Sequence, residues 1–338
     1  MEKDDIRINR GIIHILDSTM AAPVLSDMPF DTGSDFCDFL KGHIYKLISG
    51  DDLKTCHFNE GESQVYQALL DYSEENFVPI SKMLAGILFD IMNENIDIPQ
   101  ADFLVIEYRV EGRNYLALLK MNYKISYTHR TKTEEIGNIN AITVQKAILP
   151  TEGQRLIEAA FINLEDYSIR MIEKKFEING EKIDYFSRMF LKCSNALSAK
   201  AKIAIVTKAV EDVQKKYYKE DEQFEAQMEA KSIIHTELEE KGALNIPQVI
   251  QKIFKEKEEF KEEVQEKLDK YKIAEDEIIP QNENTLKKFE KQHLTTDTGI
   301  EIKIPMEQYK NSDNIEFITK EDGTICVLLK NIGHIISK

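Results

Sequence analysis

The sequence contains no tryptophan, only 14 glycines and 8 prolines in 338 residues, and four cysteines spread along its length. So few glycines and prolines exclude a collagen-like or low-complexity protein. Because Cys37, Cys56, Cys193 and Cys326 form no Cys-x-x-Cys pair, they indicate reduced thiols rather than a disulfide or zinc framework. The sequence also lacks a run of about 18 apolar residues, and no apolar signal core follows its acidic start. We therefore expect a cytoplasmic protein that does not span a membrane.

Positive charge is scarce, because 44 lysines and arginines stand against 60 aspartates and glutamates, a formal net charge of −16 at pH 7. This balance excludes a globally basic protein that coats nucleic acid, so any polyanion must bind to a local basic patch. Hydrophobic residues make up 42% of the chain, a share sufficient for a packed core. The length corresponds to two or three domains.

The order of the apolar patterns predicts an α+β fold. N-terminal helices are followed by an antiparallel sheet, then by a central helical segment and by a small C-terminal β-hairpin unit. Strands and helices do not alternate as βαβ units, which argues against a doubly wound nucleotide-binding fold. The predicted domains are an N-terminal α+β domain (1–180), a helical segment (181–280) and a small β unit (281–338).

In the N-terminal part, alternating isoleucines at 6–16 predict a strand pair or a bulged strand. Residues 35–49 and 62–94 have the apolar spacing of helices, and Pro79 should divide the second stretch into two helices. The turn at 111–114 predicts a hairpin. Strands are predicted at 103–110, 115–124, 142–149 and 158–177, the last of them long enough for two strands.

In the C-terminal part, helices are predicted at 181–193, 198–219 and 221–241, and Pro247 begins a fourth that extends to about Tyr271. The dense glutamates and lysines of this fourth helix indicate a solvated face. Short strands are predicted at 301–304, 315–319 and 324–330, with a hairpin turn at Glu321-Asp322-Gly323.

No motif for a metal, a phosphate-binding loop or an activated serine is present. The seven histidines show no His-x-His or His-Glu-x-x-His spacing, and the chain contains no Gly-x-x-x-x-Gly-Lys, Gly-x-Gly-x-x-Gly or Gly-x-Ser-x-Gly sequence. Ser198 and Lys200 have the spacing of a nucleophile and its base, but Ser198 is better explained as a helix N-cap. We therefore predict no catalytic residue, no metal site and no cofactor.

One group of acids supports a catalytic alternative. Asp102 stands at the start of the strand predicted at 103–110, Glu107 follows in it, and Lys120 lies on the partner strand. Two carboxylates and a basic residue can hold a divalent cation that activates water for phosphodiester cleavage. However, Arg109 stands where such a site would need a lysine, and arginine cannot act as a general base. A Glu–Lys pair across a solvated sheet face explains the same residues, so the metal-dependent nuclease is the less favoured hypothesis.

The first basic window, 188–219, has a net charge of +6, because it holds eight lysines and arginines against two acids. On a helix its apolar residues form one stripe, and Lys208, Lys215 and Lys219 lie opposite that stripe. Such an edge can neutralise DNA phosphates, although an ordinary solvated face with an Asp212–Lys208 pair explains it too. The stripe is Ile203, Val206, Val210, Val213 and Tyr217, and the predicted DNA contacts are Arg188, Lys192, Lys200, Lys202, Lys208, Lys215, Lys216 and Lys219.

The second basic window, 113–132, contains no acid and has three tyrosines among its positive residues. Basic and aromatic residues on a hairpin can follow a nucleic-acid backbone and stack on unpaired bases. Tyrosines are also common in strands for packing reasons, and the pattern does not separate these two interpretations. The predicted DNA contacts here are Arg113, Lys120, Lys124, Arg130 and Lys132, and the tyrosines are Tyr115, Tyr123 and Tyr127.

Three parts of the sequence resemble the bacterial nucleoid-associated protein family that includes NdpA. They are the opening Ile8–Leu16, the central block Phe186–Val213, and the closing segments Gly323–Ile325 and Lys330–Ile335. The central block carries Leu191-Lys192-Cys193 and Ser198-Ala199-Lys200-Ala201-Lys202. The length and the order of elements also match, so the resemblance covers nearly the whole chain. None of these segments is a catalytic signature.

The resemblance implies a cytoplasmic protein located on the nucleoid, with DNA binding as its property, no established enzymatic activity and a link to type II topoisomerases. We therefore expect a non-catalytic DNA-binding protein whose contacts are electrostatic and weakly sequence-selective. The alternatives are an adaptor that reaches the nucleoid through a protein partner such as a topoisomerase, and the metal-dependent nuclease. A homo-oligomer would add the avidity of spaced weak patches, and the sequence leaves the oligomeric state open.

Overall fold

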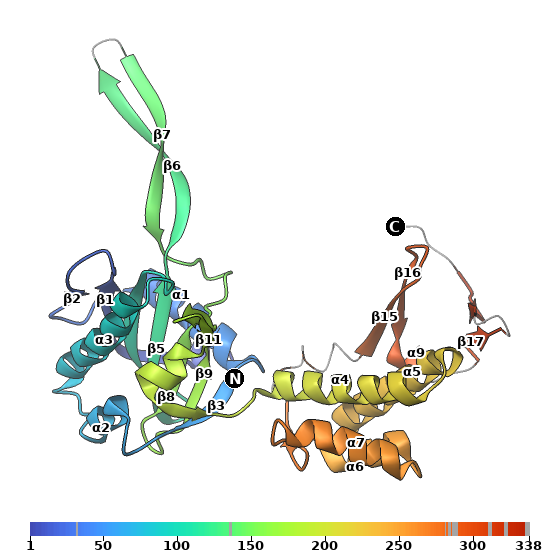
Figure 1. The fold of residues 1–338 in the computed structure, drawn as a ribbon. Coiled ribbons are helices and arrows are strands. Elements are labelled where there is room, and N and C mark those ends of the chain that lie inside the picture. The colour runs from blue at the N-terminus through green and yellow to red at the C-terminus, as the bar shows by residue number, and fades with distance from the viewer. Residues whose placement is uncertain are drawn as a thin grey trace. The chain divides into compact units, whose positions relative to one another are not determined.

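The computed structural model of the chain describes residues 1–31, 33–134, 137–280, 282, 285, 290–309, 313–320 and 324–334. The protein is α+β, as the sequence predicts, with helices and antiparallel sheets (Figure 1). The chain forms two compact units, residues 1–197 (unit 1) and residues 198–338 (unit 2). The three-part division at residues 180 and 280 stays a prediction.

Unit 1 is built around an eight-stranded sheet in which all neighbouring strands are antiparallel. Strands β4 and β5 pair over their whole length through the two-residue turn Glu111–Gly112. Both turn residues have positive φ, 49° and 83°, as the tight turn of a twisted hairpin requires. The strand order is β12-β3-β9-β8-β5-β4-β1-β2, with β1 at Arg7–Leu16, β2 at Val24–Leu25, β3 at Lys54–Phe58, β4 at Ala101–Val110, β5 at Arg113–Asn122, β8 at Ala159–Asn163, β9 at Ile169–Ile172 and β12 at Cys193–Asn195.

Helices cover both faces of this sheet. Because successive residues of β4 and β5 point to opposite faces, the apolar side chains of these strands enter two cores. Phe103 and Val105 enter one core with α2, α3 and the π-helical turn η2, whereas Leu104 and Ile106 enter a second core with α1. A strand buried on both faces has a nearly continuous apolar sequence, as β4 does. The helices span Ser34–Ile48 (α1), Gln64–Leu70 (α2), Phe77–Glu94 (α3) and Phe186–Leu191 (η2).

The predicted strand at 6–16 and the two predicted helices at 62–94 are present, but their details differ from the prediction. The stretch 6–16 is one bulged strand, since its register with β4 shifts between Ile8 and Arg10. Two helices do occupy 62–94, but Pro79 lies in the first turn of α3, where a missing N–H costs no helical hydrogen bond. The helices are therefore separated before the proline, at residues 71–76.

The helix predicted at 181–193 is wrong. Strands β10 (Phe176–Ile178) and β11 (Glu181–Ile183) form a small hairpin there, and only η2 is helical. Asn179 and Gly180 make the turn of this hairpin with positive φ, 53° and 82°. An Asn-Gly pair between two short strands is the signal that the helical interpretation overlooked.

A long hairpin of β6 (Lys124–Glu134) and β7 (Gly137–Ile148) extends from unit 1 as a two-stranded sheet of its own (Figure 1). Most of its described side chains are exposed. The sequence predicts only the end of β7, at 142–149, because the threonines and charges of β6 provide no clear apolar period. The predicted hairpin window 113–132 is therefore split between the buried strand β5 and the exposed strand β6.

Unit 2 begins with helices whose start the sequence predicts well. The backbone N–H of Ala201 donates to Ser198 Oγ at 3.2 Å, so Ser198 is the N-cap of α4. The stretch from Pro247 to Tyr271 is two helices rather than one, because Lys255 has a φ of 45° and ends the first. The helices are α4 (Ala199–Tyr217), α5 (Glu220–Lys241), α6 (Ile246–Phe254) and α7 (Glu258–Asp269).

Short antiparallel pairs complete unit 2, and they confirm the strands predicted near 301–304, 315–319 and 324–330. The predicted turn at 321–323 lies outside the described residues, as do Gly323 and Ile335 of the family resemblance. The elements are β13 (Leu244–Asn245), β14 (Glu277–Ile278), β15 (Lys291–Thr295), β16 (Glu301–Pro305), α9 (Met306–Tyr309), β17 (Ile315–Thr319) and β18 (Ile325–Leu329), of which the sequence predicted only β16, β17 and β18.

His14 on β1 is buried in unit 1 as a neutral ring. Its Nδ1 accepts the backbone N–H of Ser26 at 3.2 Å, and its Nε2 lies 3.0 Å from Ser81 Oγ. Because Ser81 Oγ donates to the carbonyl of Val78, the Nε2–H is the donor of the His14–Ser81 bond. Burial, and secondly the charge of Lys82, lower the pKa of His14 from 6.5 to about 4.

We predict that unit 1 loses stability when the pH falls from about 6.5 towards 4. In this window the unfolded chain binds a proton at His14 that the folded protein excludes, so the stabilisation is complete above pH 6.5 and decreases below it. Between pH 6.5 and 5 the loss should be roughly 1–2 kcal/mol, measured by urea unfolding followed by circular dichroism. In His14→Gln, which does not titrate, this share of the pH dependence should disappear; an unchanged dependence would contradict the assignment.

Candidate nucleic-acid interface

The register of the β6–β7 hairpin places its positive charges on one face. Residues paired across an antiparallel ribbon share a face, and faces alternate along each strand. Arg130 pairs with Ala141, and Lys132 pairs with Ile139. Lys124 lies an even number of residues from both, so it shares their face. We call this the basic face: Lys124, Ser126, Thr128, Arg130 and Lys132 of β6 with Ile139, Ala141, Thr143 and Gln145 of β7.

The opposite face of the hairpin is apolar near its base and polar further out. Tyr127 pairs with Val144, and His129 pairs with Ile142. Further out, Thr131 Oγ1 lies 2.8 Å from Asn140 Oδ1, and Thr133 Oγ1 lies 2.8 Å from Asn138 Oδ1. We call the patch formed by Ile125, Tyr127, Ile142 and Val144 the apolar face.

The tyrosines of the second basic window do not accompany its positive charges. Tyr115 stacks on Tyr108 with ring centroids 5.4 Å apart, and Tyr123 donates to Asp102 Oδ1 at 2.5 Å. Only Tyr127 is largely exposed, and it lies on the face opposite to Arg130 and Lys132. The structure therefore provides no continuous basic and aromatic surface for stacked bases in this window.

Lys120 is buried in unit 1 instead of facing a ligand. Its side chain and that of Glu158 are both fully buried, and the Nζ atom lies 3.2 Å from Glu158 Oε2. Lys120 also donates to the carbonyl of Pro99 at 3.0 Å, and Tyr185 donates to Glu158. Burial lowers the pKa of Lys120, and the charge of Glu158 opposes this shift. Lys120 thus serves the core, whereas Arg113, at the start of β5, is exposed.

On α4 the predicted apolar stripe is buried, apart from Tyr217, which is half-buried. Lys208 and Lys215 are exposed on the helix, and Lys219 is exposed just beyond its end, so two of the three lysines share one helical edge. Within the described chain, Lys208 and Asp212 form no ion pair, and the exposure of these lysines fits both a DNA-binding edge and an ordinary solvated face.

The other lysines of the first basic window are engaged or lie elsewhere. Lys202 Nζ lies 2.6 Å from Asp276 Oδ2, and Lys216 Nζ lies 2.6 Å from Glu263 Oε2. The second pair raises the pKa of Lys216 and lowers that of Glu263. Lys200 is half-buried. Arg188, which is exposed, and Lys192, which is half-buried with a φ of 48°, belong to unit 1 rather than unit 2.

The two acids of the nuclease hypothesis point to opposite faces of the sheet, because Asp102 and Glu107 are five residues apart on β4. Asp102 bonds to Tyr123, and burial raises its pKa. Glu107 accepts the hydroxyl of Tyr72 at 2.6 Å and pairs with Arg10 at 3.2 Å. Among the described residues, no cluster of three His, Cys, Asp or Glu side chains could hold a metal ion. The predicted nuclease site is therefore not assembled.

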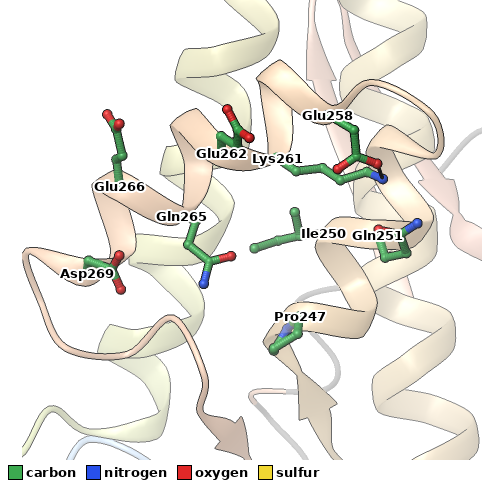
Figure 2. A pocket seen from close by; sticks show the side chains of 9 residues that line it. All are labelled: Pro247, Ile250, Gln251, Glu258, Lys261, Glu262, Gln265, Glu266 and Asp269. Atoms are coloured by element: carbon green, nitrogen blue, oxygen red, sulfur yellow. Dashed lines mark hydrogen bonds and ion pairs between the residues drawn. The ribbon is translucent and has the colours of Figure 1, made fainter.

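A cavity of 480 Å³ between α6 and α7 has the wrong charge for a nucleic acid. Figure 2 shows Glu258, Glu262, Glu266 and Asp269 around it, with Pro247, Ile250 and Gln251 on the facing helix. Its one lysine, Lys261, is paired with Glu258 at 2.7 Å. This cavity would repel phosphate, so the exposed basic face and the α4 lysines are the surfaces that suit a polyanion.

Comparison with known protein families supports a nucleoid-associated role. A protein-family model described as "Nucleoid-associated protein YejK" matches residues 12–336 of the chain. No curated protein sequence matches it. Within the part of the chain that the structure describes, no helix is long and apolar enough to cross a membrane.

We predict that Lys120→Met destabilises unit 1 by about 3–5 kcal/mol, because it leaves the buried carboxylate of Glu158 without its counter-charge. Lys120→Met/Glu158→Gln should recover most of this loss, since the amide keeps a hydrogen-bond acceptor for Tyr185 without a charge. Urea unfolding by circular dichroism measures both. If the double variant is as unstable as the single one, the ion pair is not the reason for burying Lys120.

Proposed function

Because the chain belongs to the family of nucleoid-associated proteins described as YejK, we propose that it is a non-catalytic protein that binds double-stranded DNA electrostatically and with weak sequence selectivity. Membership in this family supports a location on the nucleoid. The observation that carries the proposal is the exposed β6–β7 hairpin, whose register gathers Lys124, Arg130 and Lys132 on one face.

The hairpin has dimensions that suit DNA. Its strands lie about 4.8 Å apart, and a two-stranded ribbon fits the major groove, which is about 12 Å wide. Contacts from lysine and arginine to phosphates position a protein on the duplex without reading its sequence. The threonines among these charges are short donors that can also reach phosphate oxygens, so the basic face favours sequence-tolerant binding.

Lys208, Lys215 and Lys219 in unit 2 provide a second set of exposed ammonium groups. With a net charge of −16 for the chain, only such local patches attract DNA, while the remaining surface repels it. Each phosphate contact releases condensed counterions from the DNA. Because this release is less favourable at high salt concentration, the affinity falls as salt is added. The separation of Asp102 from Glu107 on opposite faces of β4 argues against the nuclease alternative.

The acidic remainder of the surface supports a second candidate, an adaptor that reaches the nucleoid through a protein partner such as a type II topoisomerase. The carboxylates around the α6–α7 cavity favour a basic protein surface (Figure 2). A purified protein that fails to shift DNA at low salt, but binds a DNA enzyme directly, would favour this candidate over DNA binding.

We predict that Arg130→Glu/Lys132→Glu lowers affinity for duplex DNA at least tenfold at about 100 mM salt and flattens the dependence of log K on log salt concentration. The measurement is a gel-shift titration at several salt concentrations with the full chain. The matched control is Lys270→Glu/Lys272→Glu, the same charge change at exposed positions after α7, which should stay within threefold of the wild type. Equal losses in both variants would show a general charge effect and no hairpin site.

We also predict that Lys208→Glu/Lys215→Glu/Lys219→Glu weakens binding to all DNA sequences alike, because these residues would contact phosphates and not base edges. Affinities for several unrelated duplexes of equal length provide the measurement. Unchanged affinity would remove the α4 lysines from the interface and leave the hairpin as the DNA-binding surface.

A further inference from the structure

The apolar face of the hairpin is exposed although its side chains are large. The exposed fraction is 68% for Ile125, 71% for Tyr127, 70% for Ile142 and 48% for Val144. Together these four side chains expose roughly 500 Å², the size of the largest apolar patch on a typical soluble monomer, and such a patch is often an interaction surface. The patch covers only two positions on each strand, so the twist of the ribbon does not divide it.

The hairpin also lacks the support that a ribbon of this length needs. In the part of the chain that the structure describes, its strands pair only with each other, whereas a two-stranded hairpin is marginally stable in water without a third strand or a packed layer. Loss of water from the apolar face would supply that layer. The distribution of charge fits burial of the apolar face, because Lys124, Arg130 and Lys132 lie on the other face. By strand alternation, Lys146 at the base of β7 is the one charged side chain on the apolar side.

We propose that the apolar face binds the same face of a second copy of the chain, so that two hairpins stack as a small two-layer sandwich. If fully buried, these four side chains would remove roughly 1,000 Å² from water in two copies, and burial of His129 and the Thr–Asn pairs would bring the total towards the size of about 1,200 Å² at which specific interfaces begin. A two-fold axis makes one patch its own complement. A basic protein or DNA is a poorer occupant, because this face has no carboxylate for the first and few donors for phosphates for the second.

The stack has a consequence that rests on the proposed DNA-binding function. When the apolar faces meet, the two basic faces point away from each other, about 10 Å plus the side-chain lengths apart. Each copy then presents Arg130 and Lys132 to a separate duplex. The dimer would therefore hold two DNA segments on opposite sides, while a monomer would hold one.

Sedimentation velocity of the full chain without DNA, from about 1 to 100 µM, tests the interface. The wild type should dimerise, and Ile125→Thr/Ile142→Thr should raise the dimer dissociation constant at least 50-fold. Threonine keeps a side chain that is branched at Cβ and suits a strand, but it removes apolar surface. The matched control is Ile139→Thr on the basic face of β7, which should stay within threefold. A wild type that is monomeric at 100 µM, or equal effects of both variants, would overturn the proposal.

A charge-swap experiment keeps the test valid if threonine disturbs the hairpin. Tyr127→Glu and Tyr127→Lys should each be monomeric, because like charges meet across the axis, and an equimolar mixture should form heterodimers. If the mixture stays monomeric while both variants have the circular dichroism of the wild type, the apolar faces do not meet.

Capture of a labelled duplex by bead-bound duplex separates the dimer from the DNA-binding function. Ile125→Thr/Ile142→Thr should keep its gel-shift affinity for a single duplex within threefold but lose capture of the second one. Arg130→Glu/Lys132→Glu should stay dimeric and lose both activities. If the apolar variant instead loses single-duplex affinity without a change in mass, the apolar face contacts DNA and the dimer proposal is wrong.

Discussion

Burial of strands β4 and β5 on both faces is the constraint on which unit 1 depends. Away from the β4–β5 turn, a side chain of either strand enters a core whichever way it points, so each buried polar group there needs a partner inside the protein. Lys120 forms an ion pair with Glu158, and Glu107 accepts a hydrogen bond from Tyr72. Tyr123, directly after β5, donates a hydrogen bond to Asp102. The acids that suggested a metal centre in the sequence are explained by this need for internal partners.

The β6–β7 hairpin obeys the opposite condition, since solvent reaches both of its faces. Threonine, isoleucine and valine supply strand propensity, while the charged residues keep the ribbon hydrated and discourage pairing with other edges. Its register keeps cations and apolar side chains on separate faces, and a slip of one residue would mix them. The one irregularity, between Lys124 and Ser126, lies at the base and leaves this sorting intact.

Elements with a strong apolar period could be predicted from the sequence. The stripe of α4, its Ser198 cap and the exposure of Lys208 all follow from helical geometry. The opposite orientations of Asp102 and Glu107 could also have been derived, because an odd spacing on a strand changes the face. The family resemblance, too, is confirmed by the match to residues 12–336.

Other features depend on contacts between distant residues, which a local pattern does not contain. Lys120 is buried because α2, α3 and η2 cover its face, and its partner Glu158 comes from the bend just before β8. Lys202 and Lys216 are engaged by acids on later elements, at Asp276 and Glu263. Periodicity assigns a lysine to a face of a helix or strand, but it does not reveal which element covers that face.

The pairing of β12 with β3 has a consequence for synthesis of the protein. Ser194 on β12 contacts His57 on β3 across 137 positions of the sequence. On the ribosome, this side of β3 therefore stays an open edge until residue 195 has emerged, and open edges are templates for pairing with other nascent chains. The strand that closes the edge is followed almost at once by Ser198, where α4 begins. The last strand of the unit 1 sheet therefore emerges from the ribosome just before the first helix of unit 2 does.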